Sequence, residues 1–322
     1  MKKALKIIIP LLIGVGLIYY QFKDMTPEQI DKILTSVKSA NYSWMVLSIS
    51  LGILSHVSRA MRWKYTTEAI GANYSLKNAT FTVFISYLVN LAIPRAGEIS
   101  RVALFSKYEN NPFDKTLSTV VAERVVDMLL LMTLLGTVLI LQFDNLNSAL
   151  QLEEKFSNIE TLIVTGLVGL SLVFVGWKII QKSNIGIIVK VREFIIGIFD
   201  GLKSIWVMKN KGLFLMHTFI IWGLYVLMFW VAIYSIPETS NLGIEPIMTA
   251  FAAGGIAMAV TNGGFGAFPL AIATVLAGYG VNETFGSAFG WVMWVCQTAM
   301  LVGCGILSYI LINVMNKDKT VL

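Results

Sequence analysis

Long apolar segments recur along the whole sequence and constrain the fold more than any other feature. A helix needs about 17 to 25 apolar residues to cross the hydrocarbon core of a bilayer. Six segments meet this length: Ala4–Tyr20, Trp44–Trp63, Thr116–Phe143, Thr161–Ile180, Leu213–Ile236 and Thr284–Val314. A helix also satisfies its own backbone hydrogen bonds in lipid. The sequence therefore predicts an all-α, polytopic integral membrane protein with six full transmembrane helices.

The composition points the same way. Of the 322 residues, 56% are hydrophobic and only 14% are charged, and the mean hydropathy is +0.72. Water-soluble domains carry far more charge than this. The longest predicted external loop, residues 21–43, is too short to build a catalytic core. We therefore expect a single transmembrane domain over residues 1–322 that acts within the bilayer.

Two further apolar segments are interrupted. Leu76–Ile93 stops at Pro94 and is followed by a short charged stretch, and Pro246–Val260 breaks at the sequence TNGGFGAFP before a second short apolar piece. Each pattern indicates a helix, a break and a helix too short to cross comfortably. We predict re-entrant helical hairpins at about 76–107 and 246–280. Interrupted helices in the two halves, opening to opposite faces, are typical of inverted-repeat transporters.

The distribution of charge favours this topology. Short cytoplasmic loops are enriched in Lys and Arg. With both termini cytoplasmic and one hairpin entering from each side, the external segments carry four lysines against ten acidic residues. Two full crossings in place of the hairpins would export the lysine-rich stretch 178–211. We therefore predict a multi-pass protein of the cell membrane with cytoplasmic N and C termini.

The lysine-rich stretch has a pattern of its own. From about 185 to 206, apolar residues recur at helical spacing between charged ones. This pattern predicts an amphipathic helix that lies in the membrane interface. Contact with anionic headgroups and a plain connecting role both remain open.

The third apolar segment contains three charged residues, Glu123, Arg124 and Asp127. If its helix enters near Thr116, a rise of about 1.5 Å per residue puts Asp127 roughly 16 Å along, near the bilayer midplane. Glu123 and Asp127 share a face at i,i+4, and Arg124 neighbours Asp127 at i,i+3. Together they indicate either a polar cavity or a structural ion-pair network.

Charges at this depth need partners, because each costs about 2.5 to 3.5 kcal/mol at the bilayer centre. We expect Arg124 to pair with Asp127, which leaves Glu123 in need of another cation. Four arginines are candidates, with the one at the first hairpin tip preferred: Arg95, then Arg101, Arg59 and Arg62. Arg59, Arg62 and Lys64 close the second apolar segment, where we expect long basic side chains to reach out to the interface.

The second break, TNGGFGAFP, contains no charged residue and would contribute backbone N–H groups to a binding site. Gly263, Gly264 and Gly266 permit a tight reversal, and Pro269 suits the first turn of a new helix. The unpaired N–H groups at such a helix start favour an anionic group such as a phosphate. Alternatively, these glycines only permit close helix packing, as Gly286 and Gly290 do at i,i+4.

The sequences NLAIPRAGEISR and STVVAERVVD, with the later Gly-Gly-x-Gly break, resemble the transmembrane flippase-like domain of the lysylphosphatidylglycerol synthase family. The most specific residues are Pro94, Gly97, Glu98 and Arg101 with Glu123, Arg124 and Asp127. The resemblance spans nearly the whole chain and implies a domain that moves an aminoacylated or otherwise modified phospholipid between leaflets. The family's soluble synthase domain is absent from this sequence, so synthase activity is not implied. The late motif departs from the family pattern, with Asn262 in place of a proline and Pro269 about where an acidic residue is usual.

The leading hypothesis is a lipid translocase without enzymatic activity. Its expected substrate-binding residues are Arg95, Glu98, Arg101, Glu123, Arg124, Asp127, Asn262, Gly263, Gly264 and Gly266. Glu123 and Asp127 would neutralise a cationic headgroup or relay protons, and Arg95, Arg101 and Arg124 would hold a phosphate. The alternatives are an intramembrane enzyme that uses Glu123 or Asp127 as a base, and a noncatalytic partner of a lipid synthase or glycosyltransferase.

The expected partners are a phospholipid or lipid-linked substrate and the membrane, without nucleic acid. A homo-oligomer or a lipid-synthase partner remains open. The sequence has no ATP-binding loop, so movement would follow a gradient or be passive. No metal-ligand spacing is present around Cys296 and Cys304, and we expect no cofactor or metal.

Overall fold

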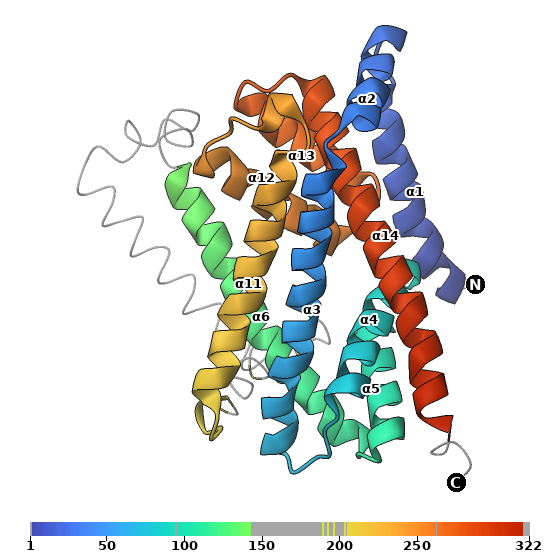
Figure 1. Cartoon of the computed structure of the whole chain (residues 1–322), viewed down its shortest axis with the longest axis vertical. Helices are drawn as coiled ribbons and strands as arrows, with labels where there is room; N and C mark the ends of the chain where they lie inside the picture. The colour runs from blue at the N-terminus through green and yellow to red at the C-terminus, as the bar shows by residue number, and fades with distance from the viewer. Residues whose placement is uncertain are drawn as a thin grey trace, which may run out of the picture. The chain divides into compact units, whose positions relative to one another are not determined.

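The computed structural model in Figure 1 describes residues 2–93, 96–142, 205–261 and 263–317, together with positions 189, 192, 196 and 203, and it describes side chains from Leu12 onward. Within these residues the secondary structure is helical and contains no strand, which confirms the all-α prediction for that part of the chain. The chain forms two compact units, Met1–Val121 with Met208–Leu322, and Ala122–Val207. We call them unit 1 and unit 2. The single domain expected over residues 1–322 stays a prediction.

Unit 1 holds most of the described helices. They are α1 Lys2–Phe22, α2 Pro27–Ser39, α3 Tyr42–Ala69, α4 Leu76–Ala92, α5 Ala96–Glu109, α11 Lys211–Ile233, the 3₁₀ helix η1 Pro237–Thr239, α12 Ile244–Val260, α13 Ala267–Gly278 and α14 Glu283–Met315. Helix α6, Phe113–Leu141, begins in unit 1 and continues into unit 2.

Among the described residues, α3, α11 and α14 are long and apolar enough to cross a membrane. They coincide with three of the six predicted crossings. Two other predicted crossings, Ala4–Tyr20 and Thr116–Phe143, overlap α1 and α6, and their role as spans stays a prediction. The predicted crossing Thr161–Ile180 and most of the interfacial helix at 185–206 lie outside the described residues.

Helix α2 lies within the segment that the sequence predicted to be an external loop. It begins with a capping box, in which Thr26 Oγ1 accepts from Gln29 N at 3.3 Å and Gln29 Oε1 accepts from Thr26 N at 2.8 Å. Pro27 occupies the first helical position, where its missing N–H costs nothing. These local signals are present in the sequence, so the helix could have been predicted.

Helices α3 and α11 pack side by side and run antiparallel. Near one end Ser48 Oγ donates to Met228 O at 2.9 Å, and toward the other end Arg62 Nη1 donates to Thr218 Oγ1 at 3.1 Å. Helix α14 crosses this pair, and Gly52 of α3 is small enough to let Met228 and Met300 approach. This antiparallel pair defines two ends of unit 1, one where α3 ends and one where α11 ends.

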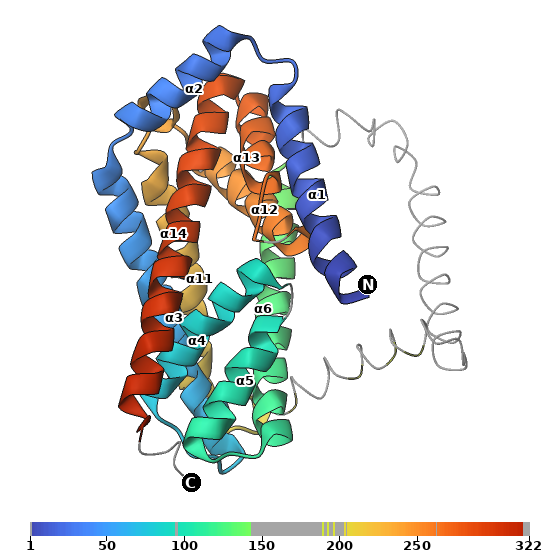
Figure 2. The ribbon, with the colours of Figure 1, turned by 90° about the vertical axis from the view of Figure 1, so that its right-hand side faces the viewer.

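Helices α4 and α5 form one helix–break–helix pair, and α12 and α13 form another. Helix α4 begins at the end of unit 1 where α3 ends, whereas α12 begins at the opposite end, after α11 and η1. Figure 2 shows the two pairs extending toward the middle of the unit from opposite ends. These helices have 12 to 17 residues, fewer than the roughly 20 that a membrane crossing needs. The structure thus contains both predicted breaks in opposite orientations, while their entry into a membrane stays a prediction.

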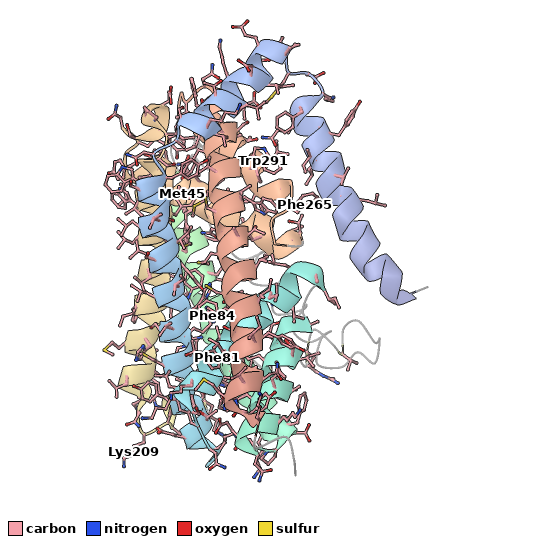
Figure 3. The ribbon with its side chains drawn as sticks, turned by 45° about the vertical axis from the view of Figure 1, so that its right-hand side comes forward. Met45, Phe81, Phe84, Lys209, Phe265 and Trp291 are labelled. Atoms are coloured by element: carbon pink, nitrogen blue, oxygen red, sulfur yellow. The ribbon has the colours of Figure 1, made fainter. Side chains whose placement is uncertain are left out.

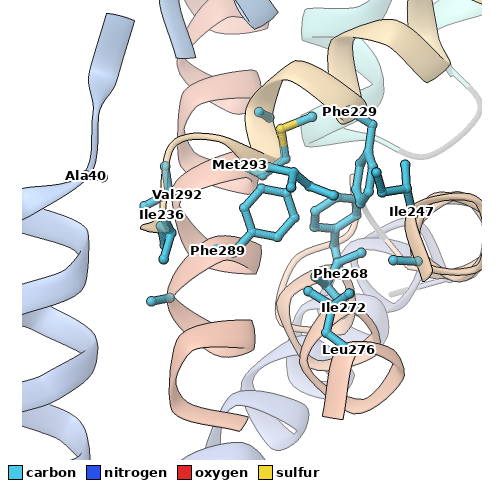
Figure 4. Close-up of a cluster of buried hydrophobic side chains, with 14 of the residues drawn as sticks. Ala40, Phe229, Ile236, Ile247, Phe268, Ile272, Leu276, Phe289, Val292 and Met293 are labelled. Carbon is cyan, nitrogen blue, oxygen red and sulfur yellow. The ribbon is translucent and has the colours of Figure 1, made fainter. Parts of the chain in front are cut away.

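Each pair packs on its own hydrophobic core. Figure 4 shows the core beneath α12 and α13, where Phe229, Phe268, Ile272 and Phe289 meet, with the rings of Phe229 and Phe289 5.6 Å apart. A second cluster lies beneath α4 and α5 and includes residues of α3 and α6: Ala60, Trp63, Ala79, Val83, Val102, Phe105 and Val120. Burial of apolar surface in these clusters therefore stabilises the position of each helix pair.

Candidate functional site

The turns of the two helix pairs meet in the middle of unit 1. A Cβ built on Gly263, in the turn after α12, would lie 2.7 Å from Leu91 Cδ2 near the end of α4. Trp294 of α14 donates from Nε1 to Gly263 O at 2.8 Å. A small cavity of about 10 Å³ beside this contact is lined by Leu91, Gly263, Trp294, Gln297 and Thr298, among others. It has room for about one water molecule.

The turn between α12 and α13 has the backbone that its glycines predict. Gly263, Gly264 and Gly266 have φ of 59°, 77° and 70°, the left-handed region that side chains other than glycine rarely adopt. Helix α13 starts at Ala267, so Pro269 lies in its first turn as predicted. Asn262 lies outside the described residues.

The alternative role predicted for these glycines, close packing of helices, is also seen in this region. A Cβ on Gly290 would lie 2.7 Å from Pro269 Cα, and one on Gly286 would lie 3.1 Å from Ala273 Cα. The turn further contacts α1, because Gly266 lies directly against the backbone oxygen of Gly14. In Figure 3, Phe265 lies between this turn and α1. The glycines therefore serve both the reversal and the close approach of neighbouring helices.

The turn between α4 and α5 is fastened by a side chain that the sequence analysis did not single out. Asn90 Oδ1 accepts from the backbone N of Gly97 at 2.7 Å, and Asn90 Nδ2 lies 3.5 Å from Glu98 Oε2. Gly97 lies directly against the backbone oxygen of Ser86, where a larger residue would not fit. Glu98 is half-buried next to this contact. Pro94 and Arg95 lie outside the described residues, so the preferred partner for Glu123 stays a prediction.

Arg101 is buried on α5 and stacks on an aromatic ring. Its guanidinium carbon lies 3.7 Å from the centroid of the Trp63 ring. Trp63 in turn donates from Nε1 to Thr119 Oγ1 of α6 at 2.8 Å. Such cation–π contacts contribute about 0.5 to 2 kcal/mol, with the larger value in desolvated sites. Arg101 is thus oriented by three helices of unit 1.

The prediction that Arg59 and Arg62 reach out to the interface is wrong. Both side chains are buried, at 5% and 0% exposure. Arg62 donates to Thr218 Oγ1 and lies over the Phe214 ring at 5.1 Å, and Arg59 Nη2 lies 3.5 Å from Tyr225 Oη. The reason is that α3 continues to Ala69, which moves the arginines into the helix interior, and α11 supplies their polar contacts. Lys64 does face outward.

Aromatic and polar side chains surround these arginines. The ring of His56 lies 4.3 Å from that of Tyr87, and the hydroxyl of Tyr87 lies 3.4 Å from that of Tyr225. We use the name arginine centre for two sets of contacts that α3 joins through the adjacent residues Arg62 and Trp63: Arg59 and Arg62 with His56, Tyr87, Thr218 and Tyr225, and Arg101 with Trp63. It draws on α3, α4, α5 and α11 of unit 1. No sequence pattern indicated a role for the two tyrosines, because neither stands in a charged motif.

The three charged residues of α6 differ in how far their side chains are buried. Glu123 and Asp127 are buried, at 1% and 7% exposure, whereas Arg124 is exposed. The shared face of Glu123 and Asp127 at i,i+4 is therefore as predicted. The expected pairing of Arg124 with Asp127 stays a prediction, as does an arginine partner for Glu123.

Residues 7–305 of the chain match the family described as the lysylphosphatidylglycerol synthase TM region. The chain belongs to this family. A curated relative, the UPF0104 membrane protein MJ1595 of Methanocaldococcus jannaschii, is 33% identical over 101 residues, which is 30% of each chain. The chain thus aligns with less than a third of that relative's length. No solved structure matches the chain.

The family match confirms the resemblance seen in the motifs and makes the chain a membrane protein of the lysylphosphatidylglycerol synthase TM family. The family motif and the arginine centre share a helix, since the motif residues Gly97 and Arg101 both belong to α5. Buried guanidinium groups carry several N–H donors in a fixed plane, which suits them to a phosphate or carboxylate. Among the described residues, no group of three His, Cys, Asp or Glu side chains could hold a metal ion.

Proposed function

We propose that this family member is a lipid translocase that moves a phospholipid, with or without an aminoacyl group, or a lipid-linked headgroup between the leaflets of the cell membrane. The observation that carries the proposal is the meeting of the α4–α5 and α12–α13 turns at Leu91 and Gly263. Paired breaks of opposite orientation in the two halves of a chain are a recurring way to build a transport site at the bilayer midplane.

In this proposal the two helix pairs are re-entrant and α3, α11 and α14 cross the membrane. The excess of Lys and Arg in the loops that would be internal supports cytoplasmic termini. The α4–α5 pair then enters from the cytoplasm and the α12–α13 pair from the opposite side. Non-helical backbone at membrane depth is tolerated where protein or a water-filled cavity surrounds it.

The arginine centre supplies the chemistry for an anionic headgroup. A buried charge in a membrane is costly, and intramembrane ionisable residues commonly mark a substrate path. Arg59, Arg62 and Arg101 would bind the phosphate, because the planar guanidinium makes paired hydrogen bonds to phosphate oxygens. Glu123 and Asp127 would neutralise a cationic headgroup or relay protons. In the absence of a nucleotide-binding motif, we propose that a lipid, ion or proton gradient drives movement, or that movement is passive.

Proteoliposomes with a fluorescent phospholipid and a membrane-impermeant quencher test this function. Purified protein should raise the rate at which labelled lipid crosses between leaflets, and mass spectrometry of the recovered lipid should find it unchanged. Arg62→Gln should lower the rate about tenfold or more, while Lys32→Gln, on the exposed face of α2, should not. A chemically altered lipid would instead favour an intramembrane enzyme. No transfer and no product would leave a noncatalytic partner of a synthase or glycosyltransferase.

A further inference from the structure

A larger cavity lies at the end of unit 1 where α3 ends and α11 begins. Its volume is about 600 Å³, within the range of small-molecule sites. It is lined by Met61, Lys64, Tyr65, Glu68, Tyr74 and His217, among others. None of the residues expected from the sequence to bind substrate lines it. It is therefore separate from the meeting point of the two turns.

The wall of this cavity between α3 and α4 is held by its own hydrogen bonds. Asn73 N donates to Asn111 Oδ1 at 2.9 Å, and Asn111 Nδ2 donates back to Asn73 O at 2.8 Å. Tyr74 donates its hydroxyl to Ala60 O at 2.7 Å. A wall fixed before binding lowers the entropic cost of holding a ligand. The cavity is thus preorganised.

One cation and one anion line the cavity together. Lys64 Nζ lies 3.6 Å from Glu68 Oε1, and both side chains are partly exposed. An exposed ion pair of this kind contributes only about 0 to 1 kcal/mol, so a ligand can separate the two groups at little cost. A ligand of a single charge would satisfy one group and leave the other without its partner. A zwitterion can bind both.

Two aromatic side chains of the cavity lining, Tyr65 and His217, lie close together. His217 Nδ1 lies 2.9 Å from Ser58 Oγ, and the His217 ring lies 5.9 Å from that of Tyr65. The next residue of α11, Thr218, accepts the hydrogen bond from Arg62. The rings of Tyr65 and His217 offer an aromatic face for an ammonium group in the cavity.

We propose that this cavity binds a zwitterionic headgroup that carries a phosphate and a primary amine, the phosphoethanolamine class. Lys64 binds the phosphate, and Glu68 accepts hydrogen bonds from the ammonium. The aromatic rings of Tyr65 and His217 form the wall beside the amine. This inference rests on the proposed function, since it assigns the cavity as the place where a headgroup of this class is held before transfer.

Binding to the purified full-length chain tests the assignment. Isothermal titration calorimetry would compare soluble glycerophosphoethanolamine with glycerophosphoglycerol, which lacks the amine, and glycerophosphocholine, which lacks the N–H donors. We expect glycerophosphoethanolamine to bind most tightly and Glu68→Gln to weaken it about tenfold. Lys64→Gln should weaken all three ligands. Glu28→Gln is the matched control, because Glu28 and Lys32 form an i,i+4 pair at 2.9 Å on α2, away from the cavity.

The same titrations with phosphatidylethanolamine in nanodiscs separate the two sources of the headgroup. Loss of affinity in Glu68→Gln for the lipid supports a membrane lipid as ligand, whereas loss for the soluble compound alone supports a free phosphoamine. Equal binding of the amine and glycerol compounds, or an unchanged affinity in Glu68→Gln, overturns the assignment. If headgroup binding depends on Glu68 but no lipid is transferred, the cavity assignment holds and the proposed translocase function is refuted. If lipid is transferred without Glu68-dependent binding, the translocase function holds and the cavity assignment is refuted.

Discussion

The indole Nε1 of Trp294 donates a hydrogen bond to the backbone oxygen of Gly263 at 2.8 Å, and this bond ties the turn between α12 and α13 to α14. Trp294→Phe should destabilise the protein by about 1 kcal/mol, because one partly buried hydrogen bond is lost. Trp291 stands one turn earlier on α14, and its Nε1 has no hydrogen-bond partner among the described residues. Thermal unfolding in detergent should therefore show a clearly smaller effect for Trp291→Phe. Equal losses in the two variants would mean that the bond to Gly263 does not stabilise the turn.

The contact between α1 and the same turn offers a comparison of two glycines. A Cβ on Gly14 would lie 2.8 Å from Phe265 O, whereas nothing lies within 4 Å of one on Gly16. Gly14→Val should cost about 1 to 3 kcal/mol, the usual range for overpacking. Gly16→Val should be close to neutral in the same unfolding assay. A stable Gly14→Val variant would show that α1 can leave the turn without penalty.

Asn90 fastens the first turn, and two substitutions separate its two contacts. Asn90→Ala leaves the N–H of Gly97 without its side-chain acceptor and should cost about 1 to 3 kcal/mol. Asn90→Asp keeps that acceptor but places a second carboxylate beside Glu98. We expect pairing of Asn90→Asp with Glu98→Gln to recover stability, as measured by chemical unfolding. If the double variant is no more stable than Asn90→Asp alone, repulsion from Glu98 is not the cause.

Arg101 should not tolerate replacement by lysine. Its guanidinium stacks on Trp63 at 3.7 Å, a planar contact that a compact ammonium cannot reproduce. We expect Arg101→Lys to lower lipid transfer in proteoliposomes about tenfold while the protein still inserts and folds. Lys107→Arg, at the exposed end of α5, is the control for a basic exchange on the same helix. Full activity of Arg101→Lys would mean that charge alone is required there.

Glu123 and Arg124 are neighbours of opposite exposure. Glu123 is buried and Arg124 is exposed, so Glu123→Gln should abolish lipid transfer and Arg124→Gln should lower it less than threefold. This expectation removes Arg124 from the substrate-binding residues that the sequence predicted, where it was assigned to the phosphate. The measurement is the lipid transfer rate of the Glu123→Gln and Arg124→Gln variants, compared at equal membrane insertion. A complete loss in Arg124→Gln would restore Arg124 to the substrate path.

Several features could be read from the sequence because they depend on neighbouring residues. The long apolar runs predicted α3, α11 and α14, and glycines at 263, 264 and 266 predicted a turn with positive φ, since few other residues adopt that backbone. The motif residues around Gly97 and Glu123 predicted the family, which the match over residues 7–305 confirmed. The i,i+4 face of Glu123 and Asp127 followed from helix geometry alone.

The sequence alone determined where helices form and break and to which family the chain belongs, because apolar runs, glycines and prolines act on the backbone next to them. Tertiary structure decided which polar side chains are buried together. Arg62 meets Thr218 from a distant helix, and Leu91 meets Gly263 from the other half of the chain. Such partners depend on how helices pack over long sequence separations, and no local pattern encodes that packing.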